Sequence, residues 1–175
     1  GSLVKADRRL FAYGPRGLQM FDEQPGVLAE IQQRKAVNPH DAEALIREAE
    51  LWMLTPRYDD AAKQLLTIRE ADLSPLLKRR HRAVLWQALV GVIQTDASHA
   101  DEALADIARL AVTPDEKLSV ELFRIDREVT AGNSRDAFDA YWQLAEQDQG
   151  PATITRPHQP QLQVQRRVWL RGKLS

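Results

Sequence analysis

The residues whose types could support metal or cysteine chemistry are scattered along the chain. The four histidines, His40, His81, His99 and His158, fall in four separate predicted turns, helix ends or linkers. A helical zinc site needs two histidines at i and i+4, and neither such a pair nor an HExxH motif occurs. The chain has no cysteine, which excludes disulfides, thiolate metal sites and cysteine nucleophiles. The sequence therefore predicts no metal site and no cofactor.

Carboxylate pairs could serve acid–base catalysis, but here they stand at the starts of predicted helices. Asp59 and Asp60, like Asp101 and Glu102, are placed where an acid favours the positive end of the helix dipole. The glycine-containing sequence at 14–17 lacks the lysine and the following helix of a phosphate loop, and no G-x-S-x-G motif exists. We therefore predict that the chain is not an enzyme.

One dense basic run, residues 78–82, could bind the phosphates of a nucleic acid. It has no interleaved aromatic residues, and the region around it is acidic. The net charge is −8 over residues 23–148, between +2 for residues 1–22 and +5 for residues 149–175. We expect the run to be the exposed, overhanging start of a long helix, so the sequence does not favour nucleic acid as the partner.

Capping signals and apolar periodicity divide the middle of the chain into helices. Ser74 and Thr113 each precede a proline that can occupy the first helical position, and Glu116 completes a capping box with Thr113. Ser98 and Asp101 form a weaker version of the same box. Helices are predicted near residues 26–37, 42–55, 59–71, 75–95, 99–111, 115–131 and 134–148. With 43% hydrophobic residues, the chain can bury a core, and no apolar stretch is long enough to span a membrane.

Three of these helices begin alike, with two charged residues before an alanine of the buried type. The alanines are Ala61, Ala103 and Ala137, and they are separated by 42 and 34 residues. Larger residues stand four and seven positions after each alanine: Leu65 and Ile68, Ile107 and Leu110, Tyr141 and Leu144. A small side chain at a helix crossing lets two antiparallel helices approach closely, and larger residues fill the space around it. The pattern predicts an internal repeat of helical pairs.

Residues 42–75 resemble one unit of the tetratricopeptide repeat (TPR) family, whose period is about 34 residues. The matching residues are Leu45, Ala49, Trp52, Tyr58, Ala61, Leu65, Ile68 and, slightly late, Pro75. Residues 83–116 and 118–149 resemble two further units. The second unit has an inserted residue and a lengthened connection at 71–82, and the third carries Glu121 where an aromatic residue is usual. The resemblance implies an all-α, TPR-like solenoid of about three degenerate repeats, spanning residues 26–149.

Such a solenoid has a concave face that commonly binds a polypeptide. The positions that the resemblance places on this face are Ile46, Glu50, Met53, Gln87, Gln94, Leu122 and Asp126. None is the lysine or asparagine with which some TPR domains clamp a C-terminal carboxylate, so that clamp is disfavoured. Glu50 and Asp126 would suit a basic or neutral peptide, or the chain's own basic tail, although acids on a solvated face need no partner. The repeat also places Ala61, Ala103, Ala137, Trp52, Trp86 and Trp142 at packing positions.

The two flanks differ in composition from the helical region. Gly1-Ser2 is predicted to be a cloning remnant. Residues 3–25 are predicted to contain a β-hairpin, because apolar and aromatic residues at 10–13 and 18–22 flank a turn rich in glycine and proline. This segment weakly resembles the closing strands of blades in bacterial quinoprotein-like (PQQ-type) β-propellers. Residues 150–175 are predicted to be a proline-containing basic linker or tail, and residues 164–174 fit either a helix or a strand.

The sequence favours a domain for protein–protein interaction, or a scaffold that spaces domains, cut from a larger bacterial protein. Its expected partner is a protein or peptide, or another domain of the parent protein. Two alternatives stay open: a nucleic-acid-associated module that uses residues 78–82 and the basic tail, and an accessory domain of a larger enzyme. The compartment is open, and the bacterial envelope or periplasm would follow from the propeller resemblance.

Overall fold

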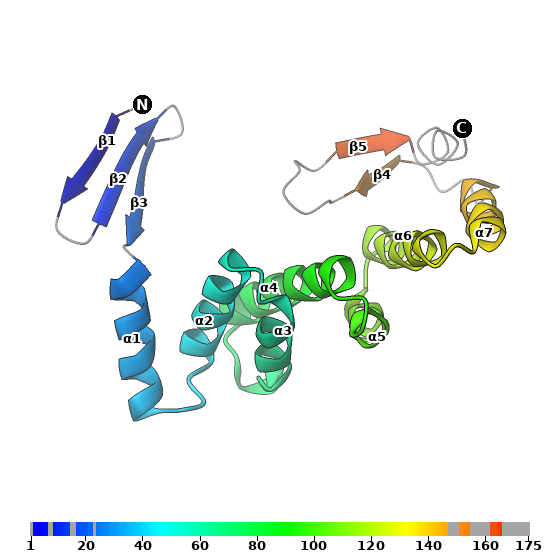
Figure 1. Ribbon diagram of the computed structural model, residues 1–175. Helices are drawn as coiled ribbons and strands as arrows, with labels where there is room; N and C mark the ends of the chain where they lie inside the picture. Colours follow the sequence, from blue (N-terminus) through cyan, green and yellow to red (C-terminus); the bar gives the residue numbers. More distant parts are fainter. Residues whose placement is uncertain are drawn as a thin grey trace. The chain divides into compact units, whose positions relative to one another are not determined.

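Helices occupy all seven of the predicted positions. In the computed structural model they are α1 (Gln24–Val37), α2 (Ala42–Leu54), α3 (Tyr58–Leu66), α4 (Pro75–Thr95), α5 (Ala100–Leu110), α6 (Pro114–Thr130) and α7 (Ser134–Glu146), as Figure 1 shows. The structure describes the backbone of residues 2–6, 9–14, 17–22, 24–146, 151–154 and 162–165, and the side chains of residues 25–144 and 146. Most of the described residues are helical, which is consistent with the predicted all-α class.

The predicted helix ends agree with the observed ones within two residues, except at the end of α3. The sequence predicts a helix to residue 71, but α3 ends at Leu66 and a short 3-10 helix, η1 (Glu70–Asp72), follows. The Thr67 hydroxyl donates a hydrogen bond to the Gln64 carbonyl, and the Ile68 amide donates one to the Leu65 carbonyl. These i→i−3 bonds tighten the last turn and end the helix.

The capping box predicted at residues 113–116 is confirmed at the start of α6. The Glu116 amide donates to the Thr113 hydroxyl at 3.2 Å, and the Glu116 carboxylate accepts from the Thr113 amide at 2.9 Å. The weaker box predicted from Ser98 and Asp101 is wrong. No side chain caps α5, because the hydroxyl and amide of Ser98 donate to Asp96 instead.

Gly132 ends α6 and sets the turn into α7. Its φ of 85° lies in the left-handed region, which glycine adopts without strain. The Asn133 amide then reaches back to the Glu128 carbonyl at 2.9 Å, and the Gly132 amide reaches the Val129 carbonyl at 3.1 Å. This satisfies carbonyls that the end of a helix leaves without intrahelical donors. Two consecutive helices can therefore fold back on each other across a short turn.

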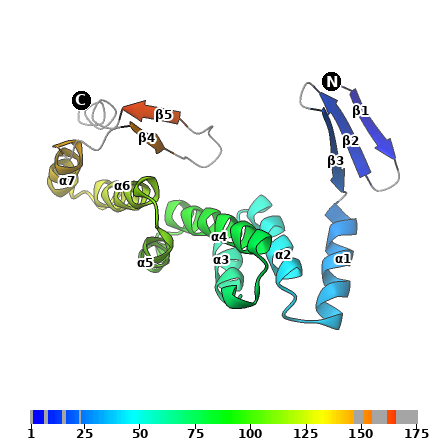
Figure 2. The same cartoon turned by 180° about the vertical axis from the view of Figure 1, so that it is seen from behind.

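The chain divides into two compact units, Gly1–Val84 and Leu85–Ser175, and the division falls inside α4. In the first unit, α2 packs on α1 and on α3, and α2 and α3 lie side by side in Figures 1 and 2. Its buried apolar residues are Ile31, Ala44, Leu45, Ile46, Ala49, Ala61, Ala62, Leu65, Leu73 and Val84. Ion pairs add to the contact of α1 with α2: Lys35 lies 2.6 Å from Glu48, and Arg47 lies 3.0 Å from Glu30.

In the second unit, α6 packs on α5 and on α7. The core between α6 and α7 is a cluster of Leu118, Leu122, Ile125, Ala137 and Tyr141, with Ala140 and Leu144 at its edge. Leu118, Leu122 and Ile125 recur every three or four residues, which is the spacing of one helix face. The apolar stripe of α6 is therefore covered by α7.

Short strands precede and follow the helices. β1 (Ser2–Ala6), β2 (Arg9–Gly14) and β3 (Gly17–Asp22) form an antiparallel sheet in the order β1-β2-β3, with Leu10 opposite Phe21. The strands β2 and β3 occupy the region of the predicted hairpin, and β1 was not predicted. β4 (Pro151–Ile154) and β5 (Leu162–Gln165) pair antiparallel within the segment predicted as a linker. The predictions for residues 1, 15–16, 147–150, 155–161 and 166–175 lie outside the described residues.

Candidate functional site

The three alanines that define the sequence repeat are buried. Ala61 is 0% exposed in α3, Ala103 is 4% exposed in α5 and Ala137 is 2% exposed in α7. The residues four positions later, Leu65, Ile107 and Tyr141, are buried as well. Each of these three helices therefore turns the same one-turn stretch, from the alanine to the residue four positions later, toward its core. The repeat seen in the sequence therefore corresponds to a repeated pattern of burial in the structure.

Two of the residues expected on the concave face are core residues. Ile46 in α2 is 0% exposed, and Leu122 in α6 is 7% exposed and belongs to the cluster under α7. Their placement on a binding face was wrong, because the apolar stripe of each helix includes them and is covered by a neighbouring helix. Neither side chain can contact a partner without unfolding of the surrounding helices.

Glu50 faces a partner within its own unit. Both of its carboxylate oxygens accept from the Arg80 guanidinium, at 2.9 Å from Nε and 2.6 Å from the terminal nitrogen. This two-point geometry is the strongest that an arginine and a carboxylate can adopt, and it raises the pKa of Arg80 above its usual value. The pair links α2 to the first turns of α4. A basic peptide would have to compete with Arg80 for this carboxylate.

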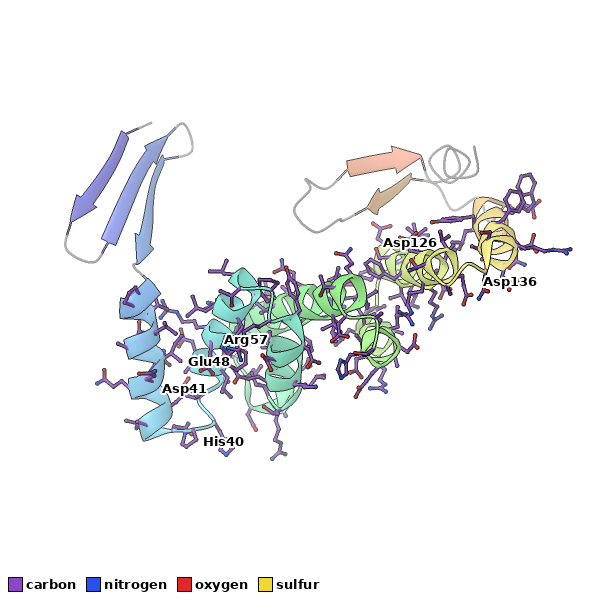
Figure 3. The ribbon with its side chains drawn as sticks, viewed as in Figure 1. His40, Asp41, Glu48, Arg57, Asp126 and Asp136 are labelled. Carbon is purple, nitrogen blue, oxygen red and sulfur yellow. The ribbon has the colours of Figure 1, made fainter. Side chains whose placement is uncertain are left out.

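Asp126 is occupied in a similar way. Its Oδ1 accepts a hydrogen bond of 2.8 Å from the hydroxyl of Tyr141, whose ring is buried between α6 and α7. Figure 3 labels Asp126 on α6. A buried tyrosine usually finds a partner for its hydroxyl, and here the carboxylate supplies it. Asp126 therefore stabilises the α6–α7 pair, a role that the sequence pattern does not reveal.

Met53, Gln87 and Gln94 are the expected concave-face residues that keep surface exposure and form no side-chain hydrogen bond with another described residue. Met53 is half-buried in α2, whereas Gln87 and Gln94 are both exposed on α4. The two glutamines are two turns apart and so lie on one face of that helix. Gln87 and Gln94 therefore form the part of the predicted concave face that is exposed on α4.

The tryptophans predicted at packing positions differ in burial. Trp52 is half-buried under the guanidinium of Arg57, whose central carbon lies 4.7 Å from the ring centroid, and Trp86 is half-buried in α4. Trp142 is 45% exposed, so its assignment to the core was wrong. It stands on a different side of α7 from the buried Ala137 and Tyr141. It stacks on Phe138 instead, with ring centroids 6.3 Å apart.

The basic run at 78–82 is not a uniformly exposed strip. Lys78 and Arg79 are exposed, but Arg80 is held by Glu50, and His81 is 2% exposed. The sequence places His81 in the exposed start of a long helix; it does lie in the second turn of α4, but its side chain is buried, so the predicted exposure was wrong. A usable signal was present, because His81 lies one turn before Leu85 on the apolar stripe of the long helix. Two outward cations are a small surface for binding a phosphate backbone.

His81 joins α4 to the end of α3 within the first unit. Its Nε2 lies 2.9 Å from the Leu65 carbonyl oxygen, and since a carbonyl can only accept, Nε2 carries the proton. Its Nδ1 has no hydrogen-bond partner among the described residues, and a carboxylate oxygen of Glu70 lies 3.7 Å from it. The imidazole thus closes the lengthened connection between α3 and α4, at the place where the sequence departs from the regular repeat.

Asp96 organises the turn between α4 and α5. The hydroxyl of Ser98 donates to it, and Nδ1 of His99 lies 2.7 Å from its second oxygen. The Ser98 hydroxyl, followed by His99, holds the pKa of the Asp96 carboxyl well below its usual range. The ionised form is favoured by folding, so its contribution to stability is complete above about pH 4, the ordinary aspartate pKa. That contribution is lost as the pH falls toward the lower pKa of the folded state.

A carboxyl NMR titration of the folded chain checks this assignment. The midpoint of Asp96 is expected below the ordinary aspartate value of about 3.9, and Ser98→Ala is expected to move it upward, because the main donor is removed. Ser134→Ala, at an exposed serine that begins α7, is the matched control and should leave the midpoint unchanged. An Asp96 midpoint at the ordinary value in the unsubstituted chain would contradict the proposed hydrogen bonding.

Within the described residues, no group of three or more histidine, aspartate or glutamate side chains is arranged to hold a metal ion. None of the helices in this part of the chain is long and apolar enough to cross a membrane. Comparison of the chain with protein-family models, curated proteins and solved structures gives no match.

Proposed function

We propose that this chain is a TPR-like helical-repeat domain without catalytic activity, which binds a polypeptide or spaces neighbouring domains of a larger protein. The observation that carries the proposal is the shared burial pattern of α3, α5 and α7. In each, an alanine near the start and a larger residue one turn later face the core. Repetition of one packing unit is the basis of solenoids, whose stacked helices leave extended surfaces for binding.

The residues best suited to contact a partner are Gln87 and Gln94. Their amides can donate and accept hydrogen bonds, and both are exposed on one face of α4. The net charge of −8 over residues 23–148 favours a neutral or basic peptide over an acidic one. Reversing the charge of Glu50 would test binding poorly, because it would also break the pair with Arg80.

Selection from a random peptide display library with the full chain as bait is the direct test. We expect neutral or basic peptides to be enriched. The double variant Gln87→Arg/Gln94→Arg is expected to bind them at least about tenfold more weakly, because it places like charges against the peptide. The double variant Gln32→Arg/Gln33→Arg carries the same change at two exposed glutamines of α1 and should bind as the unsubstituted chain does.

Two outcomes would contradict the proposed binding surface. One is that the enriched peptides bind the α4 variant as tightly as the unsubstituted chain. The other is tight binding of duplex DNA or RNA that weakens steeply with salt and is lost in Lys78→Ala/Arg79→Ala, which would favour the nucleic-acid alternative. The hairpin and propeller resemblance of residues 3–25 stays a prediction, and it concerns the parent protein rather than this surface.

A further inference from the structure

The outward side of α7 carries the most concentrated exposed aromatic surface among the described residues. Phe138 is 47% exposed and Trp142 is 45% exposed, and their rings stack with an interplanar angle of 14°. The other exposed large apolar residues are aliphatic, and exposed aliphatic residues are common on protein surfaces: Leu28, Val37, Leu54, Leu66, Leu76, Val112 and Val129. Two stacked aromatic rings, one turn apart on one helix, indicate instead a surface at which another polypeptide binds.

The two aromatic residues lie inside a longer stripe with a charge at each end. Arg135 stands one turn before Phe138, and Glu146 stands one turn after Trp142, at positions that share one face of the helix. Both end residues are exposed, and the Glu146 carboxylate accepts a hydrogen bond of 2.8 Å from the Trp142 indole. Ala137 and Tyr141 lie on a different face of α7, which packs on α6.

The stripe on one copy of α7 is complementary to the same stripe on a second copy that runs antiparallel to it. The midpoint between Phe138 and Trp142 nearly coincides with the midpoint between Arg135 and Glu146. Two copies of α7 that lie antiparallel about a two-fold axis therefore place each Phe138 against the partner's Trp142. The same register places each Arg135 beside the partner's Glu146. An isologous interface needs this property, in which residue i meets j while j meets i.

We propose that a second copy of this chain covers the aromatic stripe of α7, through an antiparallel α7–α7 contact with Arg135 paired to Glu146 of the other copy. The surface is short, so the dimer is weak and reversible, in the class of small transient interfaces. It differs from the α4 face, so loss of self-association leaves peptide binding by Gln87 and Gln94 unchanged. An experiment can therefore contradict the α7 dimer without contradicting peptide binding by α4, and the reverse.

Sedimentation velocity of the full chain over a range of concentrations tests the contact. We expect reversible dimerisation, which Trp142→Ala abolishes at concentrations where the unsubstituted chain is half dimeric. Leu54→Ala, at a leucine of α2 that is 72% exposed, is the matched control and should leave the dimer constant unchanged. A chain that remains monomeric at every concentration, or a Trp142→Ala variant that dimerises normally, would overturn the proposal.

Charge exchange tests the antiparallel register. Arg135→Glu and Glu146→Arg are each expected to raise the dimer Kd at least about tenfold, because each variant places like charges together in its own homodimer. An equimolar mixture of the two single variants is expected to dimerise again, because each copy then supplies the charge that the other needs. Failure of the mixture to recover association would exclude this pairing.

The same variants separate a second copy from the chain's own basic tail, which carries Arg166, Arg167, Arg171 and Lys173 and no acid. If the tail covered the stripe, Arg135→Glu would strengthen the contact and mixing would restore nothing. Asp139 gives an independent criterion, because the two copies of this exposed residue lie near the two-fold axis. Asp139→Asn is expected to tighten the dimer, whereas it would weaken a contact with the tail.

Discussion

Replacing His81 with alanine is expected to lower the free energy of unfolding by about 2–4 kcal/mol. The imidazole is 2% exposed, and its Nε2 donates to the Leu65 carbonyl at 2.9 Å. Alanine would remove this donor and leave a cavity where α4 meets the end of α3. Urea unfolding of the full chain, followed by far-ultraviolet circular dichroism, measures the change.

Two further variants separate the causes of this loss. His40→Ala removes an exposed imidazole in the turn after α1 and is expected to change stability by less than about 0.5 kcal/mol. His81→Leu refills most of the volume without the donor, so it should recover the part of the loss that is due to the cavity. The Leu65 carbonyl also accepts from the Ile68 amide, so the hydrogen-bond part is expected to be the smaller one. If His81→Ala were as stable as His40→Ala, the imidazole would not join the two helices.

Enlarging Ala61 tests the feature on which the repeat depends. Ala61→Leu is expected to lower the free energy of unfolding by about 1–3 kcal/mol, because the side chain is 0% exposed and a larger group in a packed core displaces its neighbours. The packing between α2 and α3 would have to open. Thermal and urea unfolding of the full chain both report the loss.

The matched control is Ala29→Leu, which makes the same change at an exposed alanine in the middle of α1. It is expected to shift stability by less than about 0.5 kcal/mol, since both residues are good helix formers. Equal tolerance of leucine at positions 29 and 61 would mean that close helix approach at Ala61 is not required. That result would contradict the hypothesis that the repeat depends on small residues at helix crossings.

Local signals in the sequence were sufficient to locate the helices. A helix start depends on a few neighbouring residues, as at Thr113 and Glu116, and a helix face depends on spacing that can be counted along the chain. The burial of Ala61, Ala103 and Ala137 also follows from their spacing together with their size. These features are set within one or two turns of helix, so no knowledge of the partner helix is needed.

The roles of individual polar and aromatic side chains were decided by tertiary structure. Glu50 meets Arg80, which is 30 residues away, and Asp126 meets Tyr141, 15 residues away. Helical spacing shows which face a residue shares, but it does not show which other helix covers that face, so Ile46 was placed on a surface and Trp142 in a core. The sequence by itself determined where the helices begin, where all of them but α3 end within about two residues, and which small residues they bury. The tertiary structure alone decided which charges are already paired and which aromatic rings remain exposed, because both depend on contacts between segments that the chain brings together only when it folds.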